Sequence, residues 1–127
     1  MTTTVTAFVV ADEITRDPAT NKYTIRGVVT GIACSAVPVV QPRIGLYICL
    51  SSVHGKFTAS IRLVRSADND PVFRKDFILG VDDPTTPTEI GINLGNVRFA
   101  SFGFYHFELW SGDDMLSQVR FVVVPIA

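Results

Sequence analysis

Apolar and polar residues alternate along most of this chain in short runs, a period that predicts β-strands rather than helices. The pattern is clearest at residues 56–65, where Phe57, Ile61 and Leu63 alternate with polar side chains. Such alternation is typical of a strand with one buried and one solvated face. No segment repeats apolar residues at helical spacing over the length of a helix. The chain is therefore predicted to be all-β.

Eight strands are predicted, separated by segments rich in Gly, Pro, Asp and Asn, which adopt turn conformations easily. They are Val5–Ile14, Tyr23–Ala33, Ile44–Ser52, Lys56–Arg65, Val72–Leu79, Thr88–Leu94, Gly103–Ser111 and Met115–Pro125. A single open sheet of these strands would leave an apolar face in water, so two packed sheets are expected. The prediction is one domain over residues 1–127, an antiparallel β-sandwich with Greek-key or jelly-roll order.

The last two predicted strands form a hairpin whose register follows from their apolar positions. Pairing Phe107 with Val119 aligns both apolar sets and leaves a three-residue loop at 112–114. Four residues then share the outward face as a candidate interaction surface, namely Phe104, Trp110, Leu116 and Val122. The alternative is that the segment 95–102, with Phe99 and Phe102, covers this face. Because the final strand carries only one charged residue, it is also expected to be a poorly protected sheet edge.

Composition narrows the classes of partner. Only 18% of the residues are charged, against roughly 25% in an average soluble domain. The net charge is −1, and no run of basic residues could follow a phosphate backbone. Nucleic acid and membranes are therefore not expected as partners, no membrane-spanning segment is predicted, and the absence of a signal-like start predicts a cytoplasmic location.

Candidate chemistry is sparse. The aspartates at 68–70, 82–83 and 113–114 could collect at one end of a sandwich as calcium ligands, although Asp and Asn are also ordinary turn residues. The chain has two histidines and two cysteines, and these lack the paired spacing of a zinc site: His54, His106, Cys34 and Cys49. No metal site or cofactor is predicted, and both cysteines are expected to be free thiols.

Catalytic motifs are equally weak. The nucleophile-elbow, phosphate-loop and dinucleotide motifs do not occur. His106 and Glu108 share one strand face and could form an acid–base pair, or could simply be neighbours on a solvated surface. Asp12 and Glu13 could act as paired carboxylates, but capping the following turn and pairing with Arg16 is the favoured interpretation.

The N-terminal third carries a recognisable series of short motifs. They are the segment Phe8–Ile14, the turn Asp17-Pro18-Ala19-Thr20, the segment Lys22–Ile25 and Gly27-Val28. This series resembles a family of small bacterial proteins of unknown function, and the similarity continues to the closing hairpin. The resemblance implies a sandwich fold and a bacterial source, and it implies no site residues.

These observations predict a non-enzymatic binding or assembly module that acts through protein–protein contacts, as a homo-oligomer or with another protein. The scarcity of charge and the mixed face around Trp110 carry this expectation. The alternative is a domain that binds a small ligand or a glycan, with calcium at the Asp-rich loops.

Overall fold

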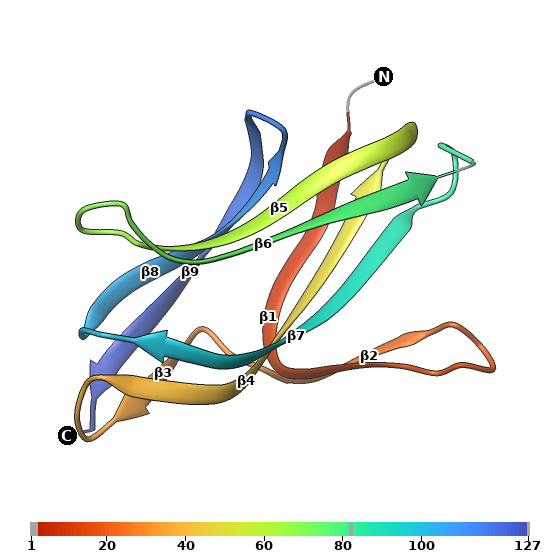
Figure 1. The fold of residues 1–127 in the computed structure, drawn as a ribbon. Coiled ribbons are helices and arrows are strands. Elements are labelled where there is room, and N and C mark those ends of the chain that lie inside the picture. Colours follow the sequence, from red (N-terminus) through yellow and green to blue (C-terminus); the bar gives the residue numbers. More distant parts are fainter. Residues whose placement is uncertain (1–2, 82, 127) are drawn as a thin grey trace.

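The computed structural model describes residues 3–81 and 83–126, and all regular structure within these ranges is β-strand (Figure 1). In chain order the strands are β1 (Thr4–Arg16), β2 (Tyr23–Val28), β3 (Gly31–Cys34), β4 (Val39–Ser51), β5 (Gly55–Arg65), β6 (Asp70–Val81), β7 (Thr88–Phe99), β8 (Gly103–Ser111) and β9 (Asp114–Pro125).

The strands form two packed sheets, which confirms the predicted β-sandwich. One sheet has the order β2-β1-β4-β7 and the other has the order β3-β9-β8-β5-β6. Their facing sides bury one hydrophobic core that includes four fully buried aromatic residues, Phe99, Tyr105, Phe107 and Phe121. Phe121 stacks on Phe99 at 5.5 Å between ring centres and meets the edge of Phe107 at 5.8 Å. Aromatic rings from both sheets thus tie the two layers together.

The second predicted strand is wrong in one respect, because the chain divides it between the two sheets. β2 pairs with β1, whereas β3 runs parallel to β9, with Gly31 opposite Val122. The chain therefore crosses from one sheet to the other at residues 29–30, and the sandwich is not purely antiparallel. A Cβ on Gly31 would lie 2.2 Å from the carbonyl oxygen of Val122. Only glycine allows β3 to approach β9 this closely.

Strands β4 and β7 are longer than predicted, because both change their buried side partway along. β7 buries Ile90 and Leu94 before the change and Val97 and Phe99 after it. Asn96 lies between these pairs with a φ of 52°, in the left-handed region. β4 changes sides beside it, around Pro42. The alternation of apolar residues is interrupted at these positions. For this reason one predicted strand begins only at Ile44 and the other already ends at Leu94.

The β8–β9 hairpin has the predicted register with Phe107 opposite Val119. The three-residue loop is wrong, because Ser111 already pairs with Asp114 across a two-residue turn. A register shift next to Trp110, which pairs with Met115, accommodates the difference. This β-bulge adds one residue to β9. The predicted pairing of Phe107 with Val119 is therefore compatible with the shorter turn.

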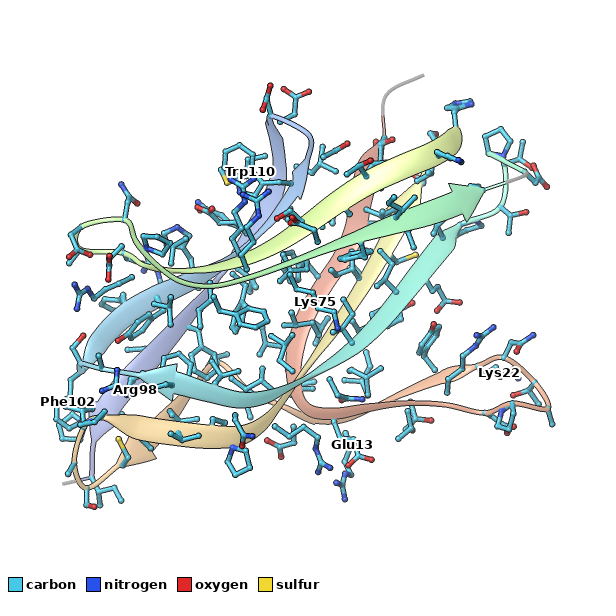
Figure 2. All side chains as sticks on the ribbon, in the orientation of Figure 1. Glu13, Lys22, Lys75, Arg98, Phe102 and Trp110 are labelled. Carbon is cyan, nitrogen blue, oxygen red and sulfur yellow. The ribbon has the colours of Figure 1, made fainter. Side chains whose placement is uncertain are left out.

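The free edges of the two sheets differ from the prediction. β9 lies between β8 and β3, so β3 covers the end of the strand that was expected to be a bare edge. The edges are instead formed by β2 and β7 in one sheet and by β3 and β6 in the other. On β6, Lys75 lies opposite the buried Ile61 and so shares the core side of the strand, yet it remains exposed (Figure 2). An inward-facing lysine of this kind discourages pairing with another strand.

The β1–β2 hairpin extends beyond β4 and packs on the outer side of its own sheet. Continuing the β1–β4 register past Ala11 and Gly45 would bring Ile14 opposite Pro42, which has no N–H to donate. The side chain of Asn93 on β7 instead forms the hydrogen bonds with the backbone of Ile14. Its Oδ1 accepts a hydrogen bond from the Ile14 N–H at 2.9 Å, and its Nδ2 donates to the Ile14 carbonyl at 2.8 Å.

Candidate functional site

The outer face of the five-stranded sheet carries three of the four predicted interaction residues. Phe104 and Val122 are directly opposite each other, and Trp110 lies further along β8 on the same face. Leu116 does not join them, because it is the residue passed over at the bulge, and its side chain packs against the core. The placement of Leu116 on this face is therefore wrong. Sequence alternation alone gives no sign of the extra residue.

One end of this face is apolar. Phe104 is 52% exposed, Val124 is 40% exposed and Ile126 is 62% exposed. The guanidinium of Arg120 lies over the Phe104 ring, 4.9 Å from its centre. The alternative interpretation, in which the segment 95–102 covers this surface, fails for Phe99, which is fully buried in the core as the last residue of β7. Phe102 is itself 39% exposed. We call Phe104, Val122, Val124 and Ile126 the apolar end.

The other end of the face is built around Trp110 (Figure 2). Arg62 on β5 lies over the indole at 4.2 Å, and the indole N–H donates to Oε1 of Glu108 at 2.9 Å. Met115, opposite Trp110, is 45% exposed. A cation–π contact and a hydrogen bond hold the indole in one orientation, with an apolar thioether beside it. Trp110 and Met115 are called the tryptophan end below.

Between the two ends lies a chain of hydrogen bonds. Oγ of Ser66 is 2.8 Å from Nδ1 of His106, and Nε2 of His106 is 2.8 Å from Oε2 of Glu108. A pocket of about 350 Å³ opens beside it, lined by Ser66, His106, Gln118 and Arg120. The predicted pair of His106 and Glu108 is thus in contact. Ser66 was missed because it follows β5, forty positions before His106, and no local pattern links the two.

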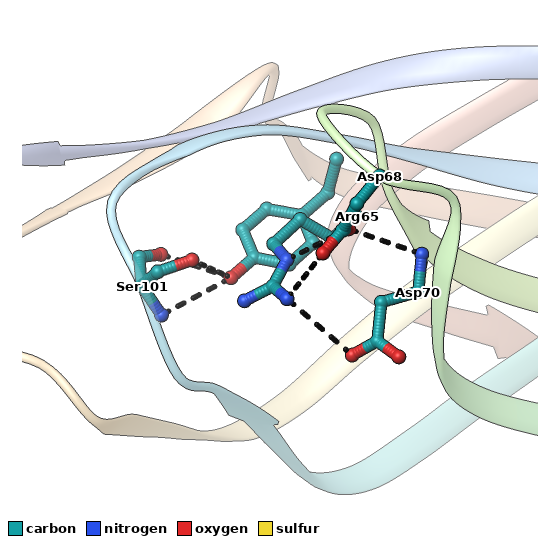
Figure 3. A network of polar contacts seen from close by, with 5 residues as sticks. Arg65, Asp68, Asp70 and Ser101 are labelled. Carbon is teal, nitrogen blue, oxygen red and sulfur yellow. Dashed lines mark hydrogen bonds and ion pairs between the residues drawn. The ribbon is translucent and has the colours of Figure 1, made fainter.

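The Asp-rich loops do not gather at one end of the sandwich. The segment 68–70 lies at the start of β6, whose first residue is Asp70, whereas Asp83 follows the far end of that strand (Figure 1). Asp68 and Asp70 are instead ion-paired with Arg65, whose Nη2 lies 2.6 Å and 3.6 Å from them (Figure 3). The hydrogen bond from Arg65 holds the pKa of Asp68 below its usual value. Asp82 lies outside the described residues, among which no group of three or more His, Cys, Asp or Glu side chains could hold a metal ion.

The two adjacent acidic residues of β1, Asp12 and Glu13, contact residues of the neighbouring strands. Glu13 is ion-paired with Arg26 at 2.9 Å and with Arg43 at 2.7 Å, rather than with Arg16 as expected. Asp12 lies against Gly27, where a Cβ would be 2.3 Å from its Oδ2. These contacts connect β1 with β2 and β4, and the Glu13 carboxylate is held by two arginines. Both cysteines are free thiols, and they lie in different sheets, Cys34 on β3 and Cys49 on β4.

Comparison with known protein families gives a match over nearly the whole chain. A model of a family of unknown function, DUF6941, matches residues 6–124. The chain belongs to this family. The match to DUF6941 includes the N-terminal motifs and the closing hairpin, so it confirms the resemblance of those residues to a family of unknown function. A search of curated proteins found no match. Within the described part of this DUF6941 member, no helix is long and apolar enough to cross a membrane.

Proposed function

We propose that this DUF6941 member is an assembly module that binds a second copy of itself through the outer face of its five-stranded sheet. The observation that carries the proposal is the exposure of Phe104, Val124 and Ile126 together at the apolar end. Contiguous exposed apolar groups on a soluble domain are typical of interaction sites. Phenylalanine, tryptophan, methionine and arginine, which line this face, are the residue types enriched where proteins meet.

A second copy fits the face because the arrangement is self-complementary. The apolar end and the tryptophan end lie at opposite ends of the hairpin, with charged and polar side chains between them. A two-fold axis through the centre would place the apolar end of one protomer on the tryptophan end of the other. The same axis would bring Glu108 of one protomer near Arg120 of its partner. Closed two-fold dimers are the commonest result of such a patch.

The test measures molar mass by light scattering behind size exclusion, over a range of protein concentrations. Val124→Asp places a charge in the apolar end, and we expect it to shift the protein from dimer to monomer. Val28→Asp is the control, because Val28 is 67% exposed on β2, which belongs to the other sheet. It should leave the dimer unchanged. Trp110→Ala should weaken the dimer from the opposite end, with its β-type circular dichroism retained.

A monomeric mass for the unaltered protein at high concentration would reject the proposal. An equal effect of Val124→Asp and Val28→Asp would also reject it, because the loss of association would then reflect added charge rather than this face. Leu116→Lys is unsuitable for the test. Leu116 is partly buried and packs against the core, so a lysine there is expected to destabilise the domain and would not isolate an effect on association.

A further inference from the structure

In the hydrogen-bonded chain at the centre of the face, the chemistry of the side chains fixes which atom donates and which accepts in each contact. The Glu108 carboxylate only accepts hydrogen bonds, so Nε2 of His106 must carry a proton to donate across the 2.8 Å contact. In the neutral imidazole, Nδ1 is then unprotonated and accepts the hydrogen bond from the Ser66 hydroxyl. The basic nitrogen of His106 therefore faces the serine oxygen.

The imidazole of His106 is held in one orientation by its surroundings. The side chains of His106 and Glu108 are 15% and 12% exposed, so both lie largely out of solvent. Trp110 donates a hydrogen bond to the other carboxylate oxygen of Glu108, which fixes the carboxylate in turn. The backbone N–H of Ser66 donates to the carbonyl of Phe104, so the serine is anchored to the strand that carries the histidine. A base within hydrogen-bond reach and a third group that orients it are the requirements for activating a serine.

The pocket supplies the remaining elements of acyl transfer. Its volume of about 350 Å³ is enough for a small acyl group beside Ser66. Gln118 and Arg120 line the same pocket, and both are exposed polar side chains with N–H groups. Such donors can stabilise the negative charge that develops on a carbonyl oxygen during attack.

We propose that Ser66 is a nucleophile that accepts acyl groups from small activated carboxylic esters. His106 is the general base and Glu108 is a positioning residue. Oγ of Ser66 forms a bond to the acyl carbon while its proton passes to Nδ1 of His106. The bond from that carbon to the leaving oxygen breaks, and the leaving group takes up the proton. Water hydrolyses the acyl-serine in the reverse sense, returning the proton to Ser66.

The experiment incubates the folded protein with p-nitrophenyl acetate and follows nitrophenolate release, intact mass and peptide mass maps. We expect one acetyl group on Ser66 and none on Ser35, an exposed serine without a neighbouring histidine among its contacts in the described structure. Ser66→Ala should abolish the adduct. His106→Gln should slow acetylation by about 100-fold or more, as expected for loss of a general base. Thermal melts of both variants verify that they fold.

The pH profile distinguishes activation from a structural role. The charged groups around His106 are Glu108 on its own strand, Arg120 on β9 and, one pair further along β5, Arg62. Acetylation should increase with pH, because only the neutral imidazole of His106 can accept the Ser66 proton. Glu108→Gln removes the carboxylate that orients the imidazole, so it should slow acetylation while the increase with pH persists.

This inference goes beyond the proposed assembly function, and the two are tested separately. Acetylation is measured in the unaltered protein and in Val124→Asp, which keeps Ser66, His106 and Glu108 intact. Acetylation of both, or of Val124→Asp alone where a dimer covers the pocket, supports the inference. Acetylation of Ser66 no faster than that of Ser35 in both proteins would overturn it. If His106→Gln folds and reacts at the unaltered rate, the inference is also overturned. Should that variant not fold, the comparison of Ser66 with Ser35 in the unaltered protein decides.

Discussion

Replacing Asn93 with aspartate should reveal how much the β1–β2 hairpin depends on one side chain. Asn93 supplies both the acceptor and the donor that Ile14 would otherwise receive from a neighbouring strand, at 2.9 and 2.8 Å. An aspartate keeps the acceptor, loses the donor and sets a carboxylate oxygen against the Ile14 carbonyl. A net hydrogen bond contributes about 1 kcal/mol, and an unsatisfied partner costs about 1–3 kcal/mol. Because Asn93 is itself exposed, we expect Asn93→Asp to lower the free energy of unfolding by about 2 kcal/mol at neutral pH.

The loss should depend on pH with a defined sign. The carboxyl has a pKa of about 3.9 in the unfolded chain, and the Ile14 carbonyl should raise it in the folded state. The protonated form can donate to that carbonyl, so both hydrogen bonds return in acid. The destabilisation is therefore absent below the unfolded pKa and is complete once the pH exceeds the folded pKa.

The assay is urea unfolding at about pH 7 and about pH 3, followed by circular dichroism. Asn96→Asp is the matched control, because Asn96 is exposed on the same strand and has no side-chain hydrogen bond among the described residues. Equal losses for the two variants at neutral pH would refute the reasoning. So would a loss for Asn93→Asp that persists unchanged in acid.

Three further predictions concern the hairpin, the core and the loops. Gly91→Ala would bring a Cβ within 2.5 Å of the Tyr23 ring, so it should displace β2 and speed limited proteolysis of the β1–β2 turn without unfolding the sandwich. Phe121→Ala removes the ring between Phe99 and Phe107 and should cost about 3–5 kcal/mol in denaturant unfolding. Asp68→Asn tests acid stability: the Asp68 pKa is lowered from 3.8 by Arg65, so its contribution is present above that value and is lost as the pH falls through the folded pKa. The melting temperature of the unaltered protein should therefore fall more steeply in acid than that of the variant.

The sequence allows prediction of those parts of the fold where the alternation of apolar residues continues without interruption. Phe107 and Val119 could be paired because each is the centre of an unbroken apolar series. The division between β2 and β3 could not be predicted, since the β-branched residues at 28–30 continue the strand pattern across the crossing. Leu116 was misplaced for a related reason, because a bulge shifts the period by one residue and no distinctive residue type marks it.

The candidate site was predictable only within single strands. His106 and Glu108 could be associated because residues two apart on a strand share a face. Ser66 joins them through the antiparallel pairing of β5 with β8, a contact that requires knowledge of the strand order. The ion pairs of Arg65 with the 68–70 loop are local and were missed because aspartates in that pattern also suggest calcium.

The parallel pairing of β3 with β9 has a consequence for the order of folding. Gly31 and Val122 are far apart in the chain, because the five strands β4 to β8 lie between them. Closing so large a loop is slow before the intervening segments are ordered, because the entropy is lost before the contact is gained. The hairpins β1–β2, β5–β6 and β8–β9 each join neighbours in the chain and can form first. We therefore expect the amide protons of β3 to gain protection from exchange last during refolding, after both sheets have otherwise assembled.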